Sequence, residues 1–160
     1  MTPNLQHHWD AMKIALARFD YEEYAKHEAT FMTSGSRGIA FLREQLEREQ
    51  DARIIFATIS KMPELDKREF LPELLDWGCA YNYTGRCWDI ITSLDEEWLQ
   101  QNIESATRPF LKTGDENAWR QILSLIRPID SLLHDKLALE ATQSTDPEIV
   151  ALGFYNLEED

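Results

Sequence analysis

An eight-residue pattern occurs three times in the chain, as ARIIFATI at residues 52–59, CWDIITSL at residues 87–94 and AWRQILSL at residues 118–125. The second copy follows the first by 35 residues, and the third follows the second by 31 residues. A repeat of about 30 to 40 residues with two helices per unit is typical of a solenoid of helical hairpins, because stacked hairpins share a core that one hairpin cannot build alone. Two positions in each copy carry large apolar side chains, namely Phe56, Ile91 and Ile122 at the first position and Ile59, Leu94 and Leu125 at the second.

Apolar residues at helical spacing continue on both sides of these copies. Near the N-terminus they recur at steps of four, three, four and three residues, which places them on one face of a helix: Leu5, Trp9, Met12, Leu16 and Phe19. Later helices are expected at roughly residues 86–94, 96–108, 116–127, 130–142 and 147–157. No segment alternates apolar and polar residues with β-branched enrichment, so no sheet is expected. The sequence therefore predicts an all-α fold of seven to nine helices, arranged as stacked helical hairpins or as an irregular helical bundle.

The segment TDPEIVALG at residues 145–153 resembles the start of a HEAT-type repeat, in which Asp-Pro opens the first helix and small residues pack inward. The resemblance covers about the last two thirds of the chain and implies a HEAT-like solenoid there. The first forty residues do not fit the repeat, and the loop TSGSRG at residues 33–38 interrupts the helical pattern. We therefore expect a single all-helical domain over residues 1–160, with an N-terminal helical cap at 1–36 and repeat-like helical hairpins at 37–160.

Side chains that support catalysis or bind metals do not occur at recognisable spacings. The four histidines, His7, His8, His27 and His134, match no zinc pattern. Glu23 lies four residues before His27, so the two could share a metal, but a pair on a helix surface is the simpler interpretation. The chain has two cysteines, Cys79 and Cys87. Because no export signal is recognised, we expect both to be reduced thiols buried in the core. We predict no enzyme, no metal and no cofactor, with an enzyme whose site is assembled from distant segments as the alternative.

The chain is strongly acidic, with 29 Asp and Glu against 16 Lys and Arg and a formal net charge of −13. This charge disfavours nucleic acid and anionic membranes as partners, because both carry phosphates that need Lys and Arg. It suits a basic protein partner, since opposite fields accelerate encounter. The N-terminus lacks the basic and apolar regions of a signal peptide, and no apolar run is long enough to span a membrane, so a cytoplasmic location is expected.

The negative charge accumulates along the chain: residues 1–50 carry −2, residues 51–110 carry −5 and residues 111–160 carry −6. Helix capping explains many of the acidic residues one by one, because Asp and Glu complement free N–H groups at helix N-termini. It does not explain the shortage of Lys and Arg in the last fifty residues. Acidic residues beside aromatic ones are suited to binding a basic protein, and they give the candidate partner-binding residues Tyr81, Tyr83, Glu96, Glu97, Trp98, Asp115, Glu116, Asp130 and Asp135.

In its small size, acidity and helical content the chain resembles the immunity proteins of bacterial toxin systems, including contact-dependent growth inhibition. The resemblance implies a non-catalytic module that binds one cognate basic toxin domain, such as a nuclease. The bound module would cover the toxin's active site with carboxylates where a nuclease binds phosphates. The alternatives are a HEAT-like scaffold or adaptor for a peptide or host protein, and the enzyme with a dispersed site.

Overall fold

The computed structural model describes residues 4–49, 51–80 and 82–158. These residues form eleven helices and no strand, which confirms the all-α fold and exceeds the expected seven to nine helices. Part of the excess is α5 (Glu64–Arg68), a five-residue helix that follows Pro63. None of its residues is buried, so α5 has no apolar face that periodicity could reveal.

Packing divides the chain into two compact units, unit 1 (Met1–Phe70) and unit 2 (Leu71–Asp160). The internal boundary expected at residues 36 and 37 therefore falls inside unit 1.

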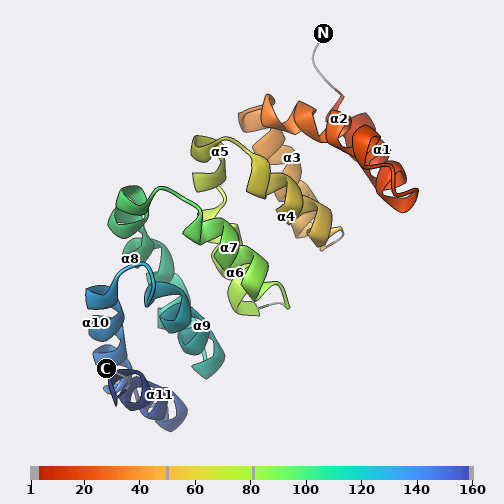
Figure 1. Cartoon of the computed structure of the whole chain (residues 1–160). Helices are drawn as coiled ribbons and strands as arrows, with labels where there is room; N and C mark the ends of the chain where they lie inside the picture. The colour runs from red at the N-terminus through yellow and green to blue at the C-terminus, as the bar shows by residue number, and fades with distance from the viewer. Residues whose placement is uncertain (1–3, 50, 81, 159–160) are drawn as a thin grey trace. The chain divides into compact units, whose positions relative to one another are not determined.

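Unit 1 contains α1 (Leu5–Ala17), α2 (Tyr21–Met32), α3 (Ser36–Glu47), α4 (Ala52–Lys61) and α5, which Figure 1 colours from red to yellow-green. Side-chain oxygens of Asn4 and Asp20 cap α1 and α2 by accepting hydrogen bonds from backbone N–H groups three residues ahead. The two helices pack closely against each other. Their core includes Trp9, whose ring contacts the rings of Phe31 and Phe41 edge to face at centroid distances of 6.1 and 5.9 Å.

The first helix ends earlier than its apolar spacing indicates. Phe19, expected on the apolar face, lies beyond the end of α1 and is 76% exposed. Its φ of 58° is in the left-handed region, because the chain turns there before Asp20 caps α2. The apolar spacing therefore includes one residue, Phe19, that does not belong to the helix.

Unit 2 contains α6 (Leu71–Ala80), α7 (Thr84–Thr92), α8 (Glu96–Thr113), α9 (Glu116–Ile126), α10 (Ser131–Ala141) and α11 (Pro147–Glu158), coloured green to blue in Figure 1. Helix α6 packs on α7, α8 on α9 and α10 on α11, while α9 also contacts α6, α10 and α11. Helix α9 is therefore the centre of this unit. No helix of the described ranges has both the length and the apolar character needed to cross a bilayer.

The two apolar positions of the recurring pattern are buried in all three copies. Each of the six side chains is at most 4% exposed: Phe56, Ile59, Ile91, Leu94, Ile122 and Leu125. Their role in the cores of the two units is thus confirmed.

Helix α8 is longer than expected, because it continues through Pro109 to Thr113 instead of ending near residue 108. A proline inside a helix removes one backbone hydrogen bond. Side chains support the helix on both sides of it: Arg108 binds Glu104 one turn earlier, and the Thr113 hydroxyl donates to the Pro109 carbonyl at 3.1 Å. The expected range of 96–108 therefore ends five residues too early.

Candidate functional site

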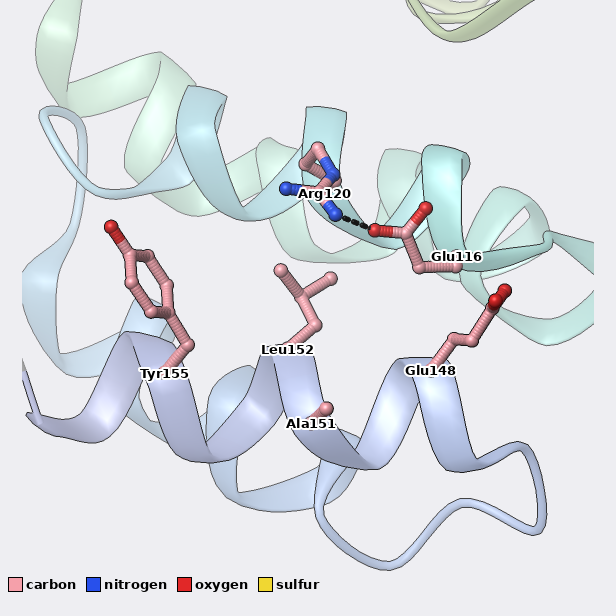
Figure 2. Close-up of a pocket in the computed structure, with 6 residues that line it drawn as sticks. All are labelled: Glu116, Arg120, Glu148, Ala151, Leu152 and Tyr155. Atoms are coloured by element: carbon pink, nitrogen blue, oxygen red, sulfur yellow. Dashed lines mark hydrogen bonds and ion pairs between the residues drawn. The ribbon is translucent and has the colours of Figure 1, made fainter.

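A groove of about 520 Å³ lies between α9 and α11 in unit 2. Glu116 and Arg120, one turn apart on α9, line one side. The other side is one face of α11 with helical spacing, formed by Glu148, Ala151, Leu152 and Tyr155. Figure 2 shows Leu152 pointing toward α9, with the two carboxylates at one end and Tyr155 at the other.

Local sequence fixes where both helices begin. The Asp115 carboxylate accepts a hydrogen bond from the Ala118 N–H at 3.1 Å and caps α9. At the start of α11 the Asp146 carboxylate accepts from the Glu148 N–H at 2.9 Å, and Pro147 occupies the first helical position. Glu116 and Glu148 therefore both lie in a first helical turn, at the same end of the groove.

The groove combines an apolar floor with polar ends. Leu152 is only 7% exposed, whereas Tyr155 is 59% exposed and presents most of its ring to solvent. Arg120 donates a hydrogen bond to Glu116 along α9, so one of the two carboxylates already has a cationic partner. The helix N-termini add partial positive charge at this end. Glu148 is exposed, and it offers a carboxylate to a ligand.

Unit 2 holds most of the negative charge of the chain. By sequence, unit 1 has twelve acidic and ten basic residues, a net charge of −2. Unit 2 has seventeen acidic and six basic residues, a net charge of −11. The net charge thus differs more between the two units than between the three sequence segments compared above. The groove lies in unit 2, the more acidic unit.

Of the eight predicted partner-binding residues that the structure describes, only Glu116 lines the groove. Asp115 and Asp130 are helix caps, and Asp130 accepts from the Leu133 N–H at 2.9 Å. Asp135 lies 3.1 Å from Nδ1 of the buried His134. Helix capping therefore accounts for two of these carboxylates, Asp115 and Asp130, in agreement with the capping role expected for many of the acidic residues.

The remaining predicted residues fall elsewhere. Glu96, Glu97 and Trp98 form the first turn of α8, where both carboxylates accept from glutamines one turn later. Tyr83 precedes α7, with its ring 5.7 Å from that of Trp77. Tyr81 lies outside the described residues.

The predicted acidic residues do not converge on one patch. Gln100 donates to both Glu96 and the carbonyl of Ile129, so the start of α8 lies beside the start of α10 and Asp130. Helix α8 has 18 residues and runs antiparallel to α9, which puts Asp115 and Glu116 about 25 Å away at the other end. The structure thus brings Glu96 together with Asp130, and Glu116 together with Glu148.

Sequence reasoning missed five of the six groove residues as site residues: Arg120, Glu148, Ala151, Leu152 and Tyr155. A signal for them was available. Residues 148, 152 and 155 are spaced by four and three, so they share one face of a helix that begins at Pro147. What the spacing does not show is that this face meets α9, because that depends on tertiary packing.

The thiols are buried, as predicted, and are poor nucleophiles. Burial raises the pKa of Cys79 to about 11 and that of Cys87 to about 12, so both are protonated at neutral pH. The described ranges contain no group of three or more His, Cys, Asp or Glu side chains arranged to hold a metal ion. Glu23 and His27 form the predicted pair on α2, with Oε1 and Nε2 2.8 Å apart.

Comparison with protein-family models, with curated proteins and with solved structures finds no match for this chain. The groove between α9 and α11, the charge of unit 2 and the protonated thiols are therefore the observations that bear on function.

Proposed function

We propose that this chain is a non-catalytic protein-binding module that binds a basic protein through unit 2. One observation carries the proposal: a groove with an apolar floor and an exposed carboxylate lies in the unit that holds −11 of the total charge of −13. A field of this sign attracts a basic partner over a distance of about one Debye length, ~10 Å at 0.1 M salt. Short-range packing in the groove then selects it.

The groove suits a lysine or arginine side chain of the partner. The aliphatic stem of such a side chain would cover Ala151 and Leu152, and its charged head would reach Glu148. The exposed ring of Tyr155 offers an aromatic face, and tyrosine is among the residues that contribute most to binding energy at interfaces. Arg120, already bound to Glu116, would stay in place as part of the wall.

We further propose that the partner is a cognate bacterial toxin domain and that this chain is its cytoplasmic immunity protein. The three helix pairs of unit 2 would act as a HEAT-like stack that holds the acidic surface rigid. If the toxin is a nuclease, the carboxylates of this surface would occupy the basic cleft that otherwise binds phosphates. The size, acidity and helical content of the chain support this proposal.

The experiment pairs this chain with the basic domain encoded by the gene beside its own, catalytically inactivated where it is toxic. Association is followed by stopped-flow fluorescence over a series of salt concentrations. We expect a complex whose association rate falls steeply with salt, while the dissociation rate changes little. Salt-independent association would contradict an acidic interface, and the absence of any adjacent gene for a basic domain would contradict the immunity assignment.

A further inference from the structure

Two histidines of unit 1 form a direct hydrogen bond between neighbouring helices. Nδ1 of His8 on α1 lies 2.9 Å from Nδ1 of His27 on α2, with ring centroids 5.1 Å apart. Nε2 of His27 lies 2.8 Å from Oε1 of Glu23, and the hydroxyl of Thr30 lies 3.3 Å from Nδ1 of His8. A carboxylate, two imidazoles and a hydroxyl are thus joined across the closely packed pair α1 and α2.

The number of protons between the two rings decides whether this contact is attractive. Hydrogen bonding from His27, followed by Lys26, lowers the pKa of Glu23, so the carboxylate is ionised and accepts the Nε2 proton of His27. In the neutral pair, His27 Nδ1 is then an acceptor for the Nδ1–H of His8. When the pair takes up one proton, one of the two Nδ1 atoms can still carry the N–H and the other can still accept, so the hydrogen bond between the rings is kept. A second added proton puts an N–H on both Nδ1 atoms, and two donors and two positive charges then face each other.

We propose that His8 and His27 form a proton-operated switch in the α1–α2 hairpin, which a single N–H···N hydrogen bond holds closed and a second proton opens. The geometry carries this inference: ring nitrogens 2.9 Å apart on two different helices can hold one proton between them, and not two. The switch lies in unit 1 and does not depend on the function proposed for unit 2.

A third imidazole and an ion pair lie beside the two rings. The ring of His7 stands 5.7 Å from that of His8 and 6.1 Å from that of His27, so a protonated His7 opposes further charge. The Glu23 carboxylate lies 3.3 Å from Lys26 and 2.8 Å from Nε2 of His27. Burial, then His27, then His7 lower the pKa of His8, which agrees with a pair that resists the second proton.

Several other charged groups on α1 and α2 have partners away from the two imidazoles. Glu28 on α2 binds Lys61 of α4 at 2.6 Å, and Lys13 on α1 binds Asp51, just before α4, at 2.6 Å. Asp10, one turn from Gln6 on α1, accepts a hydrogen bond from that side chain at 2.9 Å. These three contacts do not involve either imidazole.

Hydrogen exchange of the full chain, read by mass spectrometry, tests the switch. Amides of α1 and α2 are compared near neutral pH and near pH 5, after correction for the intrinsic pH dependence of exchange. We expect the wild type to lose protection in these two helices at the lower pH, while α9 in unit 2 keeps its protection. His8→Gln and His27→Gln should remove this pH response, and the matched control His7→Gln, on the same helix, should retain it.

An unchanged pH response in His8→Gln and His27→Gln, or no response in the wild type, would overturn the proposal. If the glutamine variants do not fold, NMR of the wild type with ¹⁵N-labelled histidine decides. A scalar coupling between the two Nδ1 nuclei should be present near neutral pH and lost near pH 5. Its absence at neutral pH would show that the rings share no proton, and its persistence near pH 5 would show that the switch does not open.

Discussion

The indole ring of Trp88 on α7 lies so close to Gly78 on α6 that a Cβ at position 78 would stand 2.1 Å from a ring carbon. Only a residue without a side chain allows this contact. The Thr84 hydroxyl, in the first turn of α7, donates to the Gly78 carbonyl at 2.8 Å and holds the two helices in the same position. The first hairpin of unit 2 is therefore built around one glycine.

Gly78→Ala should destabilise unit 2 by about 1 to 3 kcal/mol, because either the indole ring or the helix has to move. Urea unfolding followed by circular dichroism measures the change. Gly85→Ala is the matched control, since a Cβ at that position in α7 meets nothing within 4 Å. That control should be neutral or stabilising by about 0.4 to 1 kcal/mol. Equal effects of the two substitutions would contradict the packing.

A second prediction concerns the ion pairs between α8 and α10. Arg108 binds Glu140 through two hydrogen bonds of 2.5 and 3.0 Å, and Glu104 binds both Arg108 and Lys136 at 2.6 Å. These groups are partly exposed, so solvent screening limits the effect of Glu140→Gln to about 1 kcal/mol or less near neutral pH. Differential scanning calorimetry of the variant and the wild type measures it.

The same ion pairs predict a direction for the pH dependence of stability. Arg108 lowers the pKa of Glu140, and Lys136 followed by Arg108 lowers that of Glu104. Carboxylates with lowered pKa values stabilise the fold above their unfolded pKa of 4.5, and this stability is lost as pH falls through the folded values. The difference between wild type and Glu140→Gln should therefore shrink in acid. A difference that grows in acid would contradict the assignment.

A third prediction concerns the two thiols. Because Cys79 and Cys87 are buried and their pKa values are raised, a disulfide reagent such as Ellman's reagent should not modify them in the folded chain at neutral pH. Both should react within the dead time of mixing once denaturant unfolds unit 2. Rapid modification of the folded chain would indicate a reactive thiol and would revive the enzyme alternative.

Sequence periodicity predicted the helices and their buried faces well, because burial of an apolar stripe is a local property of the sequence. Ile91 and Ile122 are completely buried, as their shared place in the recurring pattern predicts. Phe19 shows where this reasoning fails: its spacing fits the helix, but its backbone turns left-handed before the next cap. The helix expected at residues 96–108 fails in the other direction, since α8 continues through Pro109 to Thr113.

The candidate site was less accessible to sequence reasoning, because it depends on which helices meet. Glu116 was singled out for the acidic residue before it and the tryptophan after it. Its groove neighbours Leu152 and Tyr155 come from α11, which begins 31 residues after Glu116. The contact between His8 and His27 has the same cause. Glu23 and His27 are visible as a pair within one helix, whereas His8 reaches them only through the packing of α1 on α2.

The central claim, that a basic ligand binds the α9–α11 groove, can be tested with matched charge-neutralising variants. The probe is an oligoarginine peptide, and isothermal titration calorimetry at low ionic strength gives its Kd for the full chain. Glu148→Gln removes a groove carboxylate, and Asp89→Asn removes an exposed carboxylate of α7, outside the groove but in the same unit. We predict that Glu148→Gln raises the Kd about five-fold, which corresponds to ~1 kcal/mol, and that Asp89→Asn changes it by less than about two-fold. Equal changes in the two variants would contradict the claim, because the peptide would then respond only to the net charge of unit 2.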